Sequence, residues 1–248
     1  MQFADDTTAS EADKDINLVM QRLGSSYSNI KKFCNSKGLA VNAAKMQLIV
    51  FKTPTNKIPE NLELQLDGCS IKPQTVVKVL GFNLDQHFTW GEHIDKVVRK
   101  CNGLIGALVK ASPYLDRNLL RMAYVALVRS HLDYCSTLLM SASVTQLRKL
   151  DVIQRKAARA IMNVSKDAHS APLLEELSLE SLSDRRYKHS LVIIQNVLCG
   201  NCHPALSEFF AIQSDDSMVI PGKSKLRLGD KRFRVLGVEV YNKFLSTI

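Results

Sequence analysis

Apolar residues recur at three- and four-residue steps in the first part of the chain, which predicts an amphipathic helix. Ser10 marks the expected start, because Asp13 three residues later completes an approximate capping box. Gly38 marks the expected end, since glycine is common just past helix C-termini. The predicted apolar face consists of Ile16, Met20, Leu23, Tyr27, Ile30 and Cys34.

The pattern changes to a β type in the following segment. Residues 46–52 predict one strand, and residues 76–84 predict another. Between them, leucines at positions 62, 64 and 66 alternate with polar residues and are followed by Asp67-Gly68, a strong hairpin signal. We therefore expect a small β unit in this part of the chain.

From Trp90 to about Val164 the helical period returns, and it predicts three amphipathic helices packed as a compact bundle. Asp116 is the expected N-cap of the second helix. The three apolar stripes are Ile94, Val97, Val98, Cys101, Leu104, Ile105 and Leu108; then Leu119, Leu120, Ala123, Tyr124, Leu127 and Val128; then Leu147, Leu150, Ile153, Ala157 and Ile161.

After Ser165 the pattern weakens. Residues 172–177 predict a short helix, residues 182–198 a longer one, and residues 213–222 a loop. The whole pattern predicts an α+β fold. In this fold, a first part that contains the strands precedes a second part that is mostly helical.

Composition narrows the class of protein. No run of eighteen apolar residues is present, and no basic segment precedes an apolar one at the N-terminus, so we expect neither a membrane partner nor secretion. The expected location is intracellular, in the cytoplasm or nucleus. Six cysteines, at positions 34, 69, 101, 135, 199 and 202, indicate reduced thiols more than a disulfide framework.

The distribution of charge along the chain indicates what kind of partner the protein binds. The net charge is +9, and the segment from His93 to Lys166 accounts for all of it, with 13 Lys and Arg against 4 Asp and Glu. Such a basic block is typical of proteins that bind nucleic-acid phosphates, and a solvated Lys-rich surface is the alternative. Its densest group is Arg148, Lys149, Arg155, Lys156 and Arg159.

The first residues carry candidate chemistry. Phe3-Ala4-Asp5-Asp6 predicts a strand end and a tight turn with two adjacent carboxylates. Carboxylates are ligands that Mg²⁺ prefers, and a pair of metal ions so held can clamp the oxygens of a phosphoryl transfer. An acidic turn that caps the next helix is the alternative.

This string resembles the catalytic-turn motif of reverse transcriptases, and further resemblances follow it in order. The series is similar to the C-terminal half of the polymerase of a non-LTR (LINE-type, jockey-like) retrotransposon. It covers most of the chain, densely to about residue 165. The later motifs are Lys37-Gly38-Leu39-Ala40-Val41-Asn42 with Lys45, Leu48-Ile49-Val50-Phe51, Val79-Leu80-Gly81-Phe82-Asn83-Leu84-Asp85 with Trp90 and His93, Leu132-Asp133-Tyr134-Cys135, and Leu150-Asp151-Val152-Ile153-Gln154-Arg155-Lys156-Ala157-Ala158-Arg159.

The resemblance implies a partial palm with the catalytic turn at 1–58 and a primer-grip-like β-hairpin unit at 59–88. It further implies a basic helical thumb at 89–165 and a C-terminal helical region with a basic tail at 166–248. The implied activity is RNA-directed DNA synthesis by the intact polymerase, with Mg²⁺, or Mn²⁺, as cofactor. The implied partners are an RNA template and a DNA primer, paired as an RNA–DNA hybrid, and a dNTP.

The resemblance also implies roles for single residues. Asp5 is a ligand of the catalytic metals, and Asp6 lies at the edge of that site. Phe3 lies near the primer terminus, with a core aromatic as the alternative. Lys45 lies near the incoming triphosphate, with an exposed strand-edge lysine as the alternative; Met46 follows it where the family commonly has threonine.

The remaining implied roles concern nucleic acid. Leu80 and Gly81 resemble the hairpin that grips the primer, with a β-bulge in a strand interior as the alternative. Trp90 is interpreted as a packing anchor. The thumb holds the hybrid by its phosphates and not by its sequence. The basic residues expected to do this are Lys96, Arg99, Lys100, Arg148, Lys149, Arg155, Lys156 and Arg159.

The family's site needs a further Asp from a strand upstream of Met1, so the chain alone is expected not to synthesise DNA. Two other functions remain open at this point: a non-enzymatic remnant that binds nucleic acid with its basic helices, and a helical protein that binds another protein.

Cys199 and Cys202, followed by His203, match half of a zinc site and also a haem-attachment string. No second cysteine pair lies at normal spacing.

Overall fold

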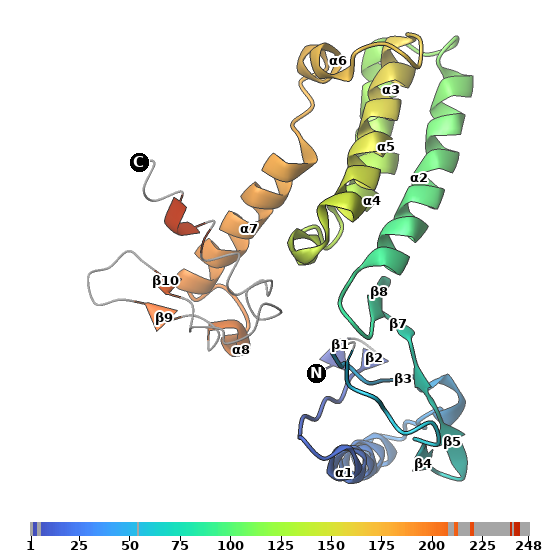
Figure 1. The fold of residues 1–248 in the computed structure, drawn as a ribbon, viewed down its shortest axis with the longest axis vertical. Helices are drawn as coiled ribbons and strands as arrows, with labels where there is room; N and C mark the ends of the chain where they lie inside the picture. The colour runs from blue at the N-terminus through green and yellow to red at the C-terminus, as the bar shows by residue number, and fades with distance from the viewer. Residues whose placement is uncertain are drawn as a thin grey trace. The chain divides into compact units, whose positions relative to one another are not determined.

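The structure is a computed structural model that describes residues 2–3, 6–53, 55–207, 211–212, 219–220, 239 and 241–243. The chain divides into two compact units, Met1–Phe88 and Thr89–Ile248, which are described separately (Figure 1). We call them the N-terminal unit and the helical unit. Helices and small sheets both occur, which confirms the predicted α+β class.

The N-terminal unit combines one long helix with short paired strands. Helix α1 spans Ile16–Ser36, and a 3₁₀ turn, η1, spans Ala43–Lys45. The antiparallel pairs are β1 (Gln2–Phe3) with β2 (Asp6–Thr7), β4 (Leu64–Leu66) with β5 (Cys69–Ile71), and β7 (Val76–Val79) with β8 (Phe82–Asp85); β3 (Leu48–Ile49) pairs in parallel with β6 (Pro73–Gln74).

The predicted start of α1 at Ser10 is wrong, because Asp15 is the N-cap. Its side chain accepts a hydrogen bond from the Asn17 amide at 2.9 Å, while the Asp13 side chain accepts one from the Asp15 amide before the helix begins. The predicted end is confirmed. Gly38 has φ +71°, and the Leu39 amide donates back to the Cys34 carbonyl at 2.9 Å, as in a Schellman cap.

The Asp67-Gly68 hairpin is confirmed between β4 and β5. Both turn residues have positive φ, 51° and 77°, and the register pairs Leu66 with Cys69. This is a type I′ turn, whose twist matches that of the flanking strands. The turn also anchors α1, because the Asp67 carboxylate accepts hydrogen bonds from the Tyr27 hydroxyl and from Lys31 Nζ, the latter at 2.6 Å.

This anchor predicts a pH dependence of stability. Lys31 and then Tyr27 lower the pKa of Asp67, and Asp67 raises the pKa of Tyr27 to about 12. The lowered carboxyl pKa stabilises the fold above the ordinary Asp pKa of about 4, and this is lost as the pH falls through the folded value. The raised phenol pKa stabilises the fold below about pH 10, and this is lost as the pH rises toward 12.

Asp67→Asn is therefore expected to flatten both limbs of the stability profile of the N-terminal unit. Asparagine keeps the turn, since it tolerates positive φ before glycine. Urea unfolding of both proteins from pH 3 to 11 measures this, with Glu60→Gln as a control that changes another exposed carboxylate of the N-terminal unit. An unchanged profile in Asp67→Asn would contradict the assignment.

The segment 76–84 was predicted as one strand, and this prediction is wrong. It forms the hairpin β7–β8, with Leu80 at φ 47° and Gly81 at φ 84° in the turn. The register pairs Val79 with Phe82, so the two residues between them form a second two-residue turn with positive φ at both positions. Gly81 thus lies in a turn and not in a strand interior.

Helices make up most of the described part of the helical unit. In chain order they are α2 (Gly91–Ala111), α3 (Arg117–Ala123), the π-helical segment η2 (Tyr124–Arg129), α4 (Ser130–Asp133), the 3₁₀ segment η3 (Leu138–Ser141), α5 (Val144–Met162), α6 (Ser170–Glu176), α7 (Leu182–Leu198) and α8 (Pro204–Ser207). Strands β9 (Ala211–Ile212) and β10 (Val219–Ile220) form an antiparallel pair.

Helices α2 and α5 pack side by side and run parallel. Lys149 Nζ on α5 lies 2.6 Å from Asp95 Oδ1 on α2, and Lys156 Nζ lies 3.1 Å from Asn102 Oδ1. The second contact is seven residues further along both helices, so the helices run in the same direction. Beneath these polar contacts the interface is apolar. Ile94, Cys101, Leu150, Ile153 and Ala157 are at most 1% exposed.

The second predicted helix is present but not uniform, since α3, η2 and α4 follow one another without a break. Asp116 is its N-cap, as predicted, and accepts a hydrogen bond from the Leu119 amide at 2.9 Å. The π-helical turn begins at Tyr124, which is fully buried with the Arg129 guanidinium 5.5 Å from its ring centroid. A π-turn inside a helix is rare.

The C-terminal part confirms the two helices predicted there, α6 and α7. Arg185 on α7 donates to both carboxylate oxygens of Asp133 on α4, with contacts of 2.6 to 3.1 Å. The loop prediction for 213–222 is wrong at Val219–Ile220, because backbone pairing makes these residues a strand. The rest of that segment and the basic tail at 231–234 lie outside the described residues.

Among the described helices, none has both the length and the apolar composition needed to cross a bilayer.

Candidate nucleic-acid interface

The predicted catalytic carboxylates are only partly described. Asp6 lies in β2, opposite Phe3 of β1, and is exposed; it therefore belongs to a strand and not to the turn. Asp5 lies outside the described residues. Among the residues that are described, no group of three or more His, Cys, Asp or Glu could hold a metal ion. The described residues therefore do not complete a Mg²⁺ site by themselves.

Lys45 ends the turn η1, whose N-cap is Asn42: the Asn42 side chain accepts a hydrogen bond from the Ala44 amide at 3.0 Å. Lys45 is exposed. It therefore lies in a turn and not at a strand edge. Whether it meets a triphosphate stays a prediction.

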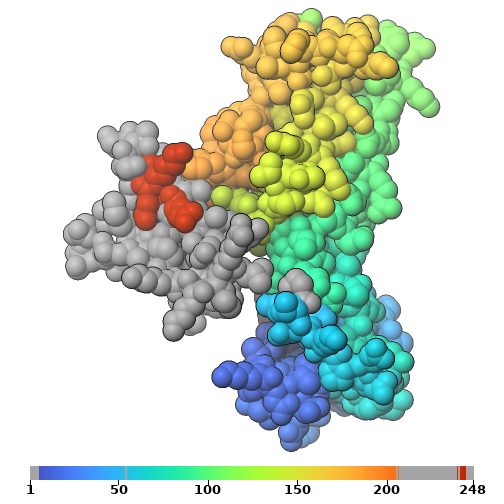
Figure 2. Space-filling view, viewed as in Figure 1, coloured from blue at the N-terminus to red at the C-terminus, as the bar shows by residue number. Residues whose placement is uncertain are grey.

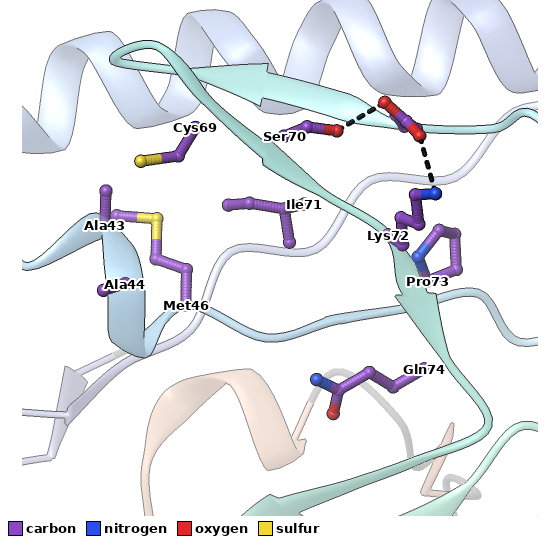
Figure 3. A pocket seen from close by; sticks show the side chains of 10 residues that line it. Ala43, Ala44, Met46, Cys69, Ser70, Ile71, Lys72, Pro73 and Gln74 are labelled. Carbon is purple, nitrogen blue, oxygen red and sulfur yellow. Dashed lines mark hydrogen bonds and ion pairs between the residues drawn. The ribbon is translucent and has the colours of Figure 1, made fainter.

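Beside η1 lies an open pocket of about 610 Å³, between Ala43, Ala44 and Met46 on one side and residues 69–74 on the other (Figure 3). Figure 3 shows the Ser70 hydroxyl and Lys72 Nζ directed at one carboxylate, that of Glu63. Ser70 and then Lys72 lower the pKa of this carboxyl. The charged groups of the pocket thus bind each other, and Lys45 does not line it.

Leu80 and Gly81 form the exposed tip of the β7–β8 hairpin. Leu80 is 37% exposed and holds φ 47°, a conformation that Cβ disfavours by about 1–2 kcal/mol in residues other than glycine. Strain of this kind is common where a side chain has a function. The tip thus presents an apolar side chain at a position where local preference favours asparagine.

Leu80→Asn is expected to raise the free energy of unfolding by about 1 kcal/mol, because asparagine relieves the left-handed strain. If the tip contacts nucleic acid, the same change lowers affinity while raising stability. Urea unfolding and hybrid binding measure the two effects. Leu115→Asn is the control, since Leu115 is similarly exposed, at 39%, without positive φ. A loss of stability in Leu80→Asn would contradict the strain argument.

The predicted cations of α2 share one uncovered face. Lys96, Arg99 and Lys100 are exposed, and none forms an ion pair with a described residue. At 100° per residue they lie opposite the buried stripe that includes Ile94 and Cys101. In Figure 2 the green surface of α2 runs along one edge of the helical unit. We call Lys96, Arg99, Lys100 and Lys110 the α2 basic face.

The α2 basic face also contains small residues. A Cβ added at Gly103 or Gly106 would meet no atom within 4 Å, so the surface between Lys100 and Lys110 is open. Gly103 and Lys110 were not among the residues predicted to bind nucleic acid. Their spacing of seven and fourteen residues from Lys96 was the signal that places them on the same face.

Two histidines near this face have lowered pKa values. Burial, and then Lys96, lower the pKa of His93 to about 4. Burial, and then Lys100, also lower the pKa of His131. Their charged forms are disfavoured, so the positive field of the face comes mainly from its lysines and arginine.

Most cations of α5 have partners within the unit. Lys149 and Lys156 bind Asp95 and Asn102 of α2. Arg155 Nε donates to the Asp151 carbonyl at 3.3 Å, and Arg159 Nε donates to the Ala168 carbonyl at 2.9 Å. Arg148 is exposed, with no ion pair to a described residue. The basic residues of α5, which are the most closely spaced in the sequence, are therefore less available to a phosphate than those of the α2 basic face.

No known family model matches the chain. The chain is similar to a transposon polymerase. Over 191 residues it is 22% identical to the "Probable RNA-directed DNA polymerase from transposon BS" of Drosophila melanogaster. The match covers 76% of this chain and 21% of that protein, so the chain spans about a fifth of the relative's length. No solved structure matches. The similarity supports a relationship to reverse transcriptases.

Proposed function

We propose that the chain is a segment of a non-LTR (LINE-type, jockey-like) reverse transcriptase, from the C-terminal half of the polymerase. In this proposal residues 1–58 belong to the palm, 59–88 to the primer grip and 89–165 to the thumb. The work of the helical unit is to hold an RNA–DNA hybrid. Synthesis of DNA from dNTPs with Mg²⁺ or Mn²⁺ is proposed for the longer protein, in which Asp5 and Asp6 contribute carboxylates.

The observation that supports this most is the α2 basic face. From Lys96 to Lys110 it extends about 21 Å at 1.5 Å per residue. Each strand of a duplex carries one phosphate about every 3.4 Å of the duplex axis, so 21 Å of that axis holds about six phosphates of one strand. Four cations over that length, with small residues between them, fit a backbone better than a single anion.

Phosphate contacts suit this task chemically. They fix the position and orientation of a duplex but carry no sequence information. Much of their free energy comes from counterions that the lysines and arginine displace. A polymerase that copies any template must hold each new base pair equally well, and a sequence-independent grip does so.

A salt titration tests the proposal. The affinity of the full chain for a blunt-ended RNA–DNA hybrid is measured from about 50 to 200 mM salt. Four neutralised phosphates, one for each cation of the α2 basic face, give a slope of log affinity against log salt near −3.6, which is a loss of roughly 150-fold over this range. A slope near zero would overturn the proposal and favour a helical protein that binds another protein.

A further inference from the structure

Two phenylalanines form an exposed stacked pair in the N-terminal unit. The ring centroids of Phe51 and Phe88 lie 4.4 Å apart, with 16° between the ring planes, and each residue is 44% exposed. Single exposed apolar residues are ordinary on protein surfaces. A parallel ring pair with nearly half of each residue in water is a flat aromatic surface.

Backbone hydrogen bonds bring the two rings together from distant parts of the chain. The Lys52 amide donates to the Gln86 carbonyl at 3.2 Å, and the Gln86 amide donates to the Thr75 carbonyl at 3.0 Å. The His87 ring nitrogen Nδ1 lies 3.0 Å from the Lys52 carbonyl. Since a carbonyl only accepts, Nδ1 is the donor. These contacts hold Lys52, which follows Phe51, against the two residues that precede Phe88.

Phe88 is held in an unfavourable backbone conformation. Its φ is 53°, a left-handed value that is uncommon for a bulky side chain. Its amide donates to the Asp85 carbonyl at 3.1 Å, and the His87 amide donates to the Asp85 carboxylate at 3.0 Å. Asp85 is 8% exposed, so the turn is anchored from inside. The orientation of the ring is thus imposed by the fold, as is common at functional positions.

We propose that Phe51 and Phe88 are a stacking platform for an unpaired nucleobase of a single-stranded nucleic acid. Every base has a flat face that stacks on an aromatic ring, so such contacts tolerate any sequence. A base placed on the pair continues a stack that the two rings have already begun. In the neighbouring segment Lys57 is an exposed cation, which suits a polyanion.

The choice of nucleic acid as the partner rests on the proposed function. The contact is nevertheless a different one. It lies in the N-terminal unit and binds a base, whereas the α2 basic face lies in the helical unit and binds phosphates. One set of measurements can therefore contradict the base contact without contradicting the phosphate contacts, or the reverse.

The test uses the full chain and a twelve-residue single-stranded oligonucleotide that contains 2-aminopurine, a base whose fluorescence falls on stacking. The variant is Phe51→Leu/Phe88→Leu, which keeps apolar side chains but removes the aromatic faces. Loss of one stacked base is expected to weaken binding about 5- to 150-fold and to abolish the fluorescence change. Phe33→Leu is the control, since Phe33 is 57% exposed on α1. It should bind as the unchanged chain does.

A blunt-ended hybrid separates the outcomes. The double variant should bind it with unchanged affinity and salt slope. If the double variant lost affinity equally for the single strand and for the hybrid, or kept its affinity for the single strand, the platform would be overturned. The salt slope would still test the proposed function. A concentration-dependent dimer that the double variant abolishes would also overturn it, because the rings would then bind a second copy. A flat salt slope with intact 2-aminopurine quenching would overturn the hybrid grip and support the platform.

Discussion

Ile153→Ala is expected to lower the free energy of unfolding of the helical unit by about 2–5 kcal/mol. Ile153 is 1% exposed and lies on the face of α5 that also carries Lys149 and Lys156, four and three residues away. Since both lysines bind side chains of α2, this face packs against α2. Truncation removes apolar contacts and leaves a cavity in the interface that joins the two helices.

Fluorescence of Trp90 during urea unfolding measures this effect, because it is the single tryptophan and lies in the helical unit. Trp90 is 6% exposed and donates from Nε1 to the Ser141 hydroxyl at 2.6 Å, so unfolding changes its surroundings. Val152→Ala is the matched control. Val152 is the preceding residue, is 39% exposed, and its truncation should change stability by no more than about 0.5 kcal/mol. Equal effects at the two positions would contradict the packing of α5 on α2.

Neutralising the α2 basic face is expected to have the largest effect on binding. Lys96→Gln/Arg99→Gln/Lys100→Gln removes three phosphate partners, so the salt slope for the RNA–DNA hybrid should flatten by about 2.7. The variant should lose affinity for all hybrid sequences alike, since phosphate contacts carry no sequence information. Because the three side chains are exposed and lie off the buried stripe, Trp90 fluorescence and stability should stay unchanged.

The matched control removes three positive charges elsewhere. Lys14→Gln/Lys32→Gln/Lys37→Gln changes exposed lysines in and beside α1, with the same change in net charge. It should leave the slope within about one unit of the unchanged value, because general attraction is screened over about 10 Å at these salt concentrations. Equal flattening in both variants would show that net charge, and not the α2 basic face, governs binding.

Local signals predicted several elements well. The Asp116 cap, the Asp67-Gly68 turn, the end of α1 at Gly38 and helix α7 are all confirmed. Each depends on the φ and ψ preferences of one or two residues or on a regular apolar period. Such preferences act within a few residues and can be read along the chain.

Local signals failed where several competed or where neighbours overrode them. Ser10, Asp13 and Asp15 can all cap a helix, and only the hydrogen bonds show that Asp15 does so. Leu80 gives no sign of a turn, because leucine disfavours positive φ. Pairing of β7 with β8 holds it there. Density in sequence also ranked the cations of α5 above those of α2.

Residue types and short spacings along the chain were enough to predict the α+β class, most helices, the basic block and the resemblance to reverse transcriptases. Which charges remain available to a ligand and which aromatic rings meet depend instead on how the folded chain packs. Lys149 binds a carboxylate 54 residues away, and Phe51 stacks on a ring 37 positions further on. Contacts over such distances depend on which faces pack together, and no preference of a single residue determines that.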